Sequence, residues 1–218
     1  MGVTSNAGGQ RHDRFAVTYA RFVESIALVA AGWASGLNAY LTVLILGASG
    51  RFGWADTPAS LQTNWVLGAA GTAFVIEFVI DKIPLLDSIW DLVHTFIRPV
   101  IGGLTGAAIA AGQLGRPAAF ALAAGLALTG HLTKTTSRLA INMSPEPFTN
   151  IVASFAEDGL VSALVALATA YPRIAAISAT VAAVVGVIIA LLVWKLARRG
   201  LRRVRAWLDG QPVARNSL

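Results

Sequence analysis

The chain has 218 residues, of which 56 % are hydrophobic and only 13 % are charged, and its mean hydropathy is +0.66. Charged residues make up roughly a quarter of an ordinary soluble domain. The composition therefore excludes that class and predicts an integral membrane protein. Cysteine is absent, which excludes disulfides, thiolate metal sites and cysteine nucleophiles.

The two ends of the chain are polar. Residues 1–15 are rich in glycine and contain no apolar stretch, so we expect no cleaved signal peptide there and interpret them as a mobile tail. Residues 16–197 form the predicted transmembrane domain, and residues 198–218 form a basic cytoplasmic tail.

Hydropathy and helix breakers together predict an all-α, polytopic transmembrane bundle of about six spans. In chain order the spans are residues 21–49, 61–83, 86–114, 117–142, 146–170 and 172–197. The last is the clearest, because Ile174 to Trp194 is an uncharged run of the roughly 20 residues that cross about 30 Å. Prolines support the joints between spans, since proline favours helix ends. We expect a kink or break at Gly36 in the first span and at Pro99 and Gly102-Gly103 in the third.

Basic residues set the expected orientation, because they are enriched in cytoplasmic loops. They gather at both ends of the chain and predict two cytoplasmic termini, hence an even number of spans: Arg11, Arg14 and Arg21 at the N-terminus, and Lys195, Arg198, Arg199, Arg202, Arg203 and Arg205 at the C-terminus. The predicted outer loops hold only Arg51, Arg116 and Arg173. The basic C-terminus could be a nucleic-acid patch, but beside a transmembrane helix we expect anionic lipid headgroups and no nucleic acid as its partner.

Each central span carries one polar stripe at steps of three or four residues, which is one face of a helix. The stripes are Glu77 and Asp81; Asp87, Asp91, His94 and Arg98; His131, Lys134, Arg138 and Asn142; and Glu146, Asn150, Ser154 and Glu157, with Asp158 beside the last. An ionisable group in hydrocarbon is costly unless paired, and by default it is a candidate functional residue. We therefore expect the stripes to face one another and the remaining surface to face lipid.

Depth singles out three of these residues. Arg98, His131 and Glu157 each lie about 17 Å from the predicted cytoplasmic end of their helix, near the membrane midplane. We expect Arg98 and Lys134 to pair with Glu77, Glu157 or Asp158, and an Arg98–Glu157 pair is the first to test. Asp87, Asp91 and Glu146 lie nearer the interface, where helix caps or solvated groups are equally good interpretations.

A weak internal repeat is visible at a shift of 59 residues, which aligns Asp87 with Glu146 and Phe96 with Phe155. It would correspond to two similar helix hairpins that enter the membrane from the same side. Chance similarity between amphipathic helices explains the pattern equally well.

The polar segments resemble a family of bacterial membrane proteins catalogued as domain of unknown function 4126. The resemblance covers roughly residues 30–170 and is carried by Gly36-Leu37-Asn38-Ala39-Tyr40-Leu41, Glu77-Phe78-Val79-Ile80-Asp81-Lys82-Ile83-Pro84, Asp87-Ser88-Ile89-Trp90-Asp91, Thr95-Phe96-Ile97-Arg98-Pro99, His131-Leu132-Thr133-Lys134, Arg138, Asn142, Ser144-Pro145-Glu146-Pro147, Asn150 and Glu157-Asp158. It implies membership of that family and adds weight to these residues, but it implies no activity.

The function predicted from these patterns is a transporter or channel for an ion or small polar solute, with a polar cavity open to the cytoplasm. The residues expected to line the pathway are Glu77, Asp81, Asp91, His94, Arg98, His131, Lys134, Arg138, Asn142, Asn150, Glu157 and Asp158. The histidines could relay protons. No cofactor is expected, although Glu77, Asp81, His131 and Asp158 offer ligands for a divalent metal.

Two alternatives stay open. An intramembrane enzyme could act on a lipid or isoprenoid phosphate, with a histidine as general base and Arg98, Lys134 and Arg138 for the phosphate. The sequence has no nucleophile elbow, no His-Glu-x-x-His zinc motif and no glycine-rich phosphate loop, so an enzyme is the less favoured interpretation. A structural scaffold could use the charges and small residues to fix helix packing. The expected location is the bacterial inner membrane, and homo-oligomers are an open alternative to a monomer.

Overall fold

The computed structural model describes residues 26–83, 86–142 and 147–208, and all regular structure in these residues is helical. The elements are a first helix, Ile26–Leu37, followed by α2 (Ala39–Arg51), the short 3₁₀ helix η1 (Ala59–Gln62), α3 (Asn64–Ile80), α4 (Leu86–Leu114), α5 (Arg116–Asn142), α6 (Pro147–Ala170) and α7 (Pro172–Leu208). The all-α prediction is confirmed. Pro147 and Pro172 open their helices, as expected for a residue whose missing N–H is not needed there.

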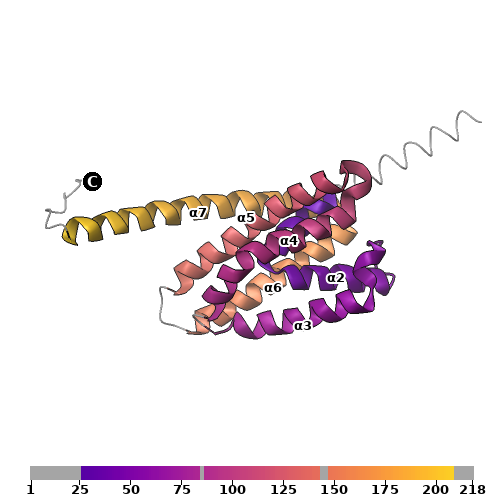
Figure 1. The fold of residues 1–218 in the computed structure, drawn as a ribbon, viewed down its shortest axis with the longest axis horizontal. Coiled ribbons are helices and arrows are strands. Elements are labelled where there is room, and N and C mark those ends of the chain that lie inside the picture. The colour runs from indigo at the N-terminus through magenta and orange to yellow at the C-terminus, as the bar shows by residue number, and fades with distance from the viewer. Residues whose placement is uncertain (1–25, 84–85, 143–146, 209–218) are drawn as a thin grey trace, which may run out of the picture.

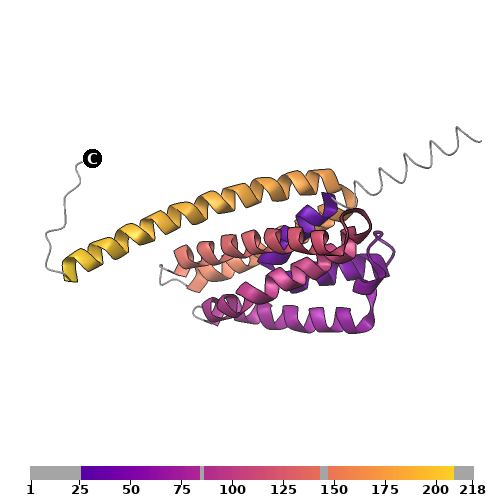
Figure 2. The same ribbon diagram turned by 45° about the horizontal axis from the view of Figure 1, so that its top comes forward.

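Helices α3 to α7 run along the bundle in alternating directions (Figures 1 and 2). Helices α3, α5 and α7 finish on the side where α4 and α6 begin, and α7 continues beyond the other helices on that side. We call this side the basic end, because α7 carries Lys195 and the arginines after it there. The opposite end holds the turn at Gly115, whose φ of +76° suits glycine between two helices.

The first helix and α2 do not form a crossing helix. Leu28 packs against Ala119 near the start of α5, whereas Gly36 lies against Gly130, halfway along α5. At that depth Asn38 has extended backbone, with φ −147° and ψ 100°, and its side chain caps α2 by accepting a hydrogen bond from the Leu41 N–H at 2.9 Å. The chain reverses at this break.

Helix α2 then returns to the end from which the first helix came, where its last residue, Arg51, donates to the side chain of Asn64 at the start of α3. We call residues 26–51 the re-entrant segment. Helix α2 has 13 residues, or about 20 Å, which is about two thirds of a bilayer core. The first helix ends at the same break inside the bundle. The prediction of one span over residues 21–49 is therefore wrong, although a break near Gly36 is confirmed.

This reversal changes the expected topology. Five helices, α3 to α7, run from end to end in the described part of the chain, so Ile26 and the end of α7 lie at opposite ends of the bundle. The prediction of two cytoplasmic termini required an even number of crossings. Residues 1–25 lie outside the described residues, so that prediction remains untested for the N-terminus itself.

Small residues hold α4 and α5 together, and this pair shares the most extensive helix contact. A Cβ on Gly102 would lie 2.6 Å from the Cβ of Ala127. One turn later in α4, a Cβ on Gly106 would collide with the Cβ of Ala123. Close approach of backbones through small residues is a common packing mode in membranes.

The expected break of α4 lies elsewhere than predicted. The helix continues through Pro99 and Gly102-Gly103, and its non-helical residue is Ala110, with φ −120° and ψ 17°. Pro99 is tolerated because one lost hydrogen bond costs less than interrupting a helix that is packed along its length.

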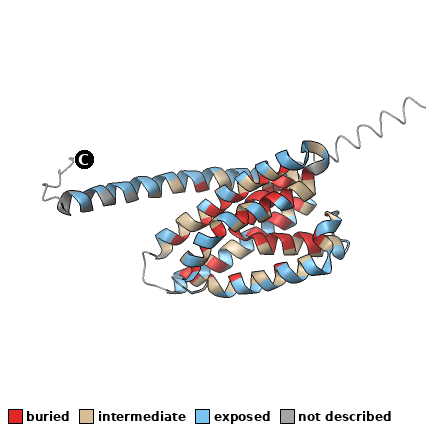
Figure 3. Ribbon diagram, viewed as in Figure 1, coloured by how far each residue is buried: buried red, intermediate tan, exposed pale blue. Residues whose placement is uncertain are grey.

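Three helices are long and apolar enough to cross a membrane: Leu86–Ala110 in α4, Phe148–Ala170 in α6 and Pro172–Gly200 in α7. The exposed surface of these helices is rich in large apolar side chains, and Figure 3 shows α7 exposed over most of its length, while the buried residues gather on α2 and the facing sides of α4, α5 and α6. An apolar exterior around a partly polar interior indicates a membrane protein.

Candidate functional site

Nine charged side chains from α3, α4, α5 and α6 meet inside the bundle. They occupy the half that lies towards the basic end, and the three cations among them are no more than 2 % exposed. We call this set the charged cluster; its members are Glu77, Asp81, Asp87, Asp91, Arg98, Lys134, Arg138, Glu157 and Asp158.

Arg98 forms the inner layer of the charged cluster. Its Nη2 lies 2.5 Å from Glu77 Oε1, and its Nη1 lies 3.0 Å from Asp91 Oδ1. The same Nη1 reaches the backbone carbonyl of Gly36 at 3.5 Å, so the guanidinium also contacts the end of the first helix. A cation beside the carbonyl end of a helix is favourable, because that end carries partial negative charge.

Lys134 forms the middle layer. Its Nζ donates to Asp81 Oδ2 at 2.5 Å and to Glu77 Oε1 at 3.4 Å. Glu157 Oε2 lies 3.7 Å away on α6. One ammonium group thus joins α5 to the end of α3 and to α6.

Arg138 forms the outer layer, nearest the basic end. It forms a bidentate pair with Glu157, in which Nε donates to Oε1 at 3.1 Å and Nη2 donates to Oε2 at 2.8 Å. Its Nη1 donates to the carbonyl of Asp81 at 3.2 Å and to the side chain of Asn150, whose amide nitrogen donates to the same carbonyl at 3.1 Å. The residues that follow α3 are therefore fixed by α5 and α6 together.

Asp158 connects the charged cluster to the re-entrant segment. Its Oδ1 accepts a hydrogen bond from Asn38 Nδ2 at 3.1 Å. Asn38 uses its other side-chain atom to cap α2. The break in the re-entrant segment is thus held by a side chain that also bonds a carboxylate of the charged cluster.

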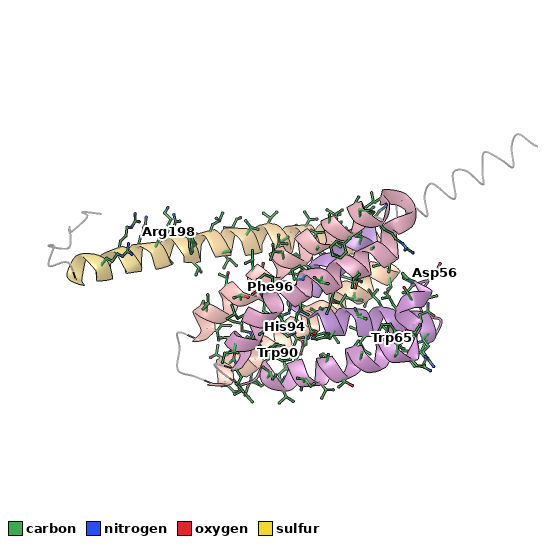
Figure 4. All side chains as sticks on the ribbon, viewed as in Figure 1. Asp56, Trp65, Trp90, His94, Phe96 and Arg198 are labelled. Atoms are coloured by element: carbon green, nitrogen blue, oxygen red, sulfur yellow. The ribbon has the colours of Figure 1, made fainter. Side chains whose placement is uncertain are left out.

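Both histidines near the charged cluster are hydrogen-bonded at each ring nitrogen. Arginine only donates, so His131 Nδ1 accepts from Arg98 at 2.8 Å, and its Nε2 donates to the Thr95 hydroxyl at 3.0 Å. His94 Nδ1 donates to the carbonyl of Trp90 at 2.8 Å, and its Nε2 accepts from the Tyr40 hydroxyl at 2.9 Å. Figure 4 labels Trp90 and His94 on α4, and their rings stack with centroids 4.4 Å apart.

A model of the family described as domain of unknown function (DUF4126) matches residues 26–202. The chain belongs to this family. The match covers the re-entrant segment and the whole charged cluster, and it confirms the resemblance seen in the sequence. No curated protein and no solved structure is significantly similar to the chain.

Most of the expected pathway residues lie together in this DUF4126 domain. Eleven of them are in the charged cluster or hydrogen-bonded near it; the side chain of Asn142 and all of Glu146 lie outside the described residues. Of the partners expected for Arg98, Glu77 is confirmed. The Arg98–Glu157 pair is wrong, because the second partner of Arg98 is Asp91 and Glu157 pairs with Arg138. The expected pairing of Lys134 with Glu77 or Glu157 occurs only at longer range than its contact with Asp81.

For Asp87 and Asp91 the sequence left helix caps, solvated groups and functional residues open. The structure excludes solvated groups, because the two side chains are 0 and 2 % exposed where α4 turns its polar face towards α5. Sequence reasoning missed Tyr40 and Trp90 as neighbours of His94. The sequence did offer one signal for Tyr40: it lies two residues after Asn38, inside one of the stretches that carry the family resemblance.

Carboxylates outnumber cations in the charged cluster of this DUF4126 domain. The described residues place six carboxylates there against Arg98, Lys134 and Arg138. With all nine side chains ionised, the charged cluster would be net negative, which would favour cations and disfavour phosphate.

The alternative metal site is not formed. Among the described residues, no three Asp, Glu or His side chains converge in a way that could hold a metal ion. His131, one of the expected ligands, instead uses both ring nitrogens for bonds to Arg98 and Thr95.

Proposed function

We propose that this protein is a multi-pass transporter of the bacterial inner membrane that moves an ion or small polar solute through the charged cluster. The observation that carries the proposal is the meeting of buried charges with the break of a re-entrant helix. Broken helices and charged residues at mid-membrane depth recur together in transport proteins, where the break supplies backbone groups to the solute.

The proposed membrane placement has five crossing helices and the re-entrant segment between two aromatic belts. Trp54 and Trp65 are 77 and 75 % exposed at the opposite end, and Figure 4 places Trp65 and Asp56 far from Arg198. On α7, Pro172 and Trp194 are 22 residues or about 33 Å apart, close to the bilayer core thickness. Tryptophan favours the interface and basic residues favour the cytoplasm, so the basic end is assigned to the cytoplasm.

The pathway is closed in this conformation. The charged side chains fill the space between the helices and are almost fully buried, so the predicted open cavity would belong to a second state. Each cation has two or more carboxylates within 4.0 Å, which would allow it to exchange partners without leaving a bare charge in a dry interior.

The two alternatives are less well supported. Phosphate binding is disfavoured by the excess of carboxylates around Arg98, Lys134 and Arg138, and both histidines are already hydrogen-bonded at each nitrogen. A purely structural network is disfavoured because apolar residues of the same volume would stabilise the bundle without the desolvation cost of buried ions.

A thermal-stability screen tests the proposal. Purified protein in detergent would be incubated with alkali, ammonium and divalent cations, amino acids and inorganic phosphate. We expect one class of solute to raise the unfolding temperature, because a ligand that binds only the folded state stabilises it. The increase should be lost in Lys134→Met and retained in Lys195→Gln, which lies outside the charged cluster. Equal responses to every class would contradict a solute site.

The basic part of α7 provides a separate prediction about lipid. Lys195, Arg198, Arg199 and Arg202 are exposed, and Arg198 lies 4.7 Å from the ring of Trp194. We expect anionic headgroups to bind here, because basic residues next to a membrane span attract them. Replacing all four by glutamine should weaken binding of phosphatidylglycerol several-fold in native mass spectrometry. Phosphatidylethanolamine should bind both proteins alike, and equal phosphatidylglycerol binding would refute this role.

A further inference from the structure

Asp158 differs from the other carboxylates of the charged cluster. In the described residues no lysine or arginine nitrogen lies within 4.0 Å of it, whereas Glu77, Asp81, Asp87, Asp91 and Glu157 each have such a neighbour. Its hydrogen bond to Asn38 occupies Oδ1, and Oδ2 is buried without a hydrogen-bond partner among the described groups.

The same deficit recurs on neighbouring carboxylates. Glu77 is 0 % exposed and leaves Oε2 without a donor, and Asp81 is 2 % exposed and leaves Oδ1 without one. A buried acceptor without a donor costs about 1–3 kcal/mol. The charged cluster thus lacks positive charge and hydrogen-bond donors in the same place, and a proton supplies both.

We propose that the charged cluster binds a proton and that Asp158 is the residue that carries it; its role as the transported ion rests on the transport function proposed above. A hydronium ion that reaches the interior from the basic end gives its proton to Asp158 Oδ2. An O–H bond forms on the carboxyl group, and a water molecule leaves. The step needs no other reactant, and its reversal releases the proton.

The surroundings of Asp158 explain how a proton on its carboxyl group would affect the re-entrant segment. The groups that act on it electrostatically are Glu77, Asp81 and Lys82 from α3 and the turn after it, and Lys134 from α5; Glu157 precedes it on α6. The ionised carboxylate accepts a charge-assisted hydrogen bond from Asn38, and such bonds are roughly twice as strong as neutral ones. Protonation weakens this bond and frees the break of the re-entrant segment to move.

Infrared spectroscopy of the purified protein in lipid nanodiscs tests proton binding directly. A protonated carboxyl group has a C=O stretching band that a carboxylate lacks. We expect this band to grow as pH is lowered in the wild type and to lose one component in Asp158→Asn. Asp56→Asn removes an exposed carboxyl group at the opposite end and should keep the component that Asp158→Asn loses. A full set of bands in Asp158→Asn would overturn the assignment.

A second variant guards against misfolding. Asp158→Glu keeps a titratable carboxyl group, so the component lost in Asp158→Asn should return at a shifted frequency. Glu157→Gln should keep the Asp158 component, because Glu157 is paired with Arg138. If the Asp158→Glu spectrum were the same as that of Asp158→Asn, the proton would belong to another group.

Flux measurements separate this proposal from the transport function. Liposomes of phosphatidylethanolamine and phosphatidylglycerol would hold a pH-sensitive dye, and a potassium diffusion potential would drive protons inward. We expect acidification that falls to the level of protein-free liposomes in Asp158→Asn and is the same in sodium and choline media. A requirement for sodium would overturn the proton as the ion. The infrared band without any flux would keep the proton site and contradict the transporter.

Discussion

Replacing Arg98 by alanine should lower the free energy of unfolding by about 3–5 kcal/mol, the cost of removing one partner from a buried ion pair. Arg98 is 0 % exposed and compensates both Glu77 and Asp91, which are also buried. Without the guanidinium, two carboxylates in a dry interior keep only the more distant Lys134 ammonium, at 3.4 and 4.0 Å. Reversible unfolding in mixed micelles measures the loss.

The double variant identifies the partner. Adding Glu77→Gln to Arg98→Ala should recover part of the lost stability, since one uncompensated charge is removed, whereas adding Glu157→Gln should recover none. Arg98→Lys should fall in between, because an ammonium keeps the charge but cannot bridge two acids as a planar guanidinium does. Equal recovery with Glu77→Gln and Glu157→Gln would contradict the pairing described above.

Replacing Gly36 by alanine should destabilise the protein by about 1–3 kcal/mol or more, the usual range for overpacking a well-packed site. The added methyl group would collide with the carbonyl oxygen of Ala127 and would lie 2.8 Å from Gly130 Cα. Both are backbone atoms, so the first helix and α5 must move apart. This movement would also draw the Gly36 carbonyl away from Arg98, so ligand-induced stabilisation should weaken along with the unfolding free energy.

Gly68 is the matched control for this substitution. It lies on the exposed face of α3, and a Cβ there would meet nothing within 4 Å. Alanine at Gly68 should leave stability unchanged or raise it by up to about 1 kcal/mol, because alanine is the better helix former. If Gly36→Ala and Gly68→Ala behaved alike, the close contact at the break would be unimportant for the fold.

Sequence patterns predicted where the helices of the bundle lie in the chain, but they did not predict the path of the first apolar segment through the bundle. The polar stripes of α4 and α5 face each other as expected, because steps of three and four residues place side chains on one face whatever surrounds the helix. For the first apolar stretch, in contrast, hydropathy predicts one span, whereas the structure has two helices that meet at Asn38. Hydropathy reports how apolar a segment is, but it cannot distinguish one helix that crosses from two short helices that meet at a break.

The partners within the candidate site also depended on tertiary structure. Periodicity identified Arg98, Lys134 and Arg138 as buried, but the acid opposite each cation depends on the rotation and relative height of the helices. The sequence offers Glu77, Glu157 or Asp158 to Arg98, and the similar depth of Arg98 and Glu157 makes that pair the first to test. In the structure Glu77 on α3 reaches Arg98, and Glu157 on α6 reaches Arg138.

The sequence by itself determined that this is a helical membrane protein of the DUF4126 family with ionisable residues turned inwards, because composition and helical spacing are local properties. Only the tertiary structure decided that Asn38 turns the chain back inside the bundle and that six carboxylates surround three cations. Both depend on contacts between segments far apart in the chain, such as Asn38 with Asp158, 120 residues away. Such contacts depend on how the helices pack together, which no single segment encodes.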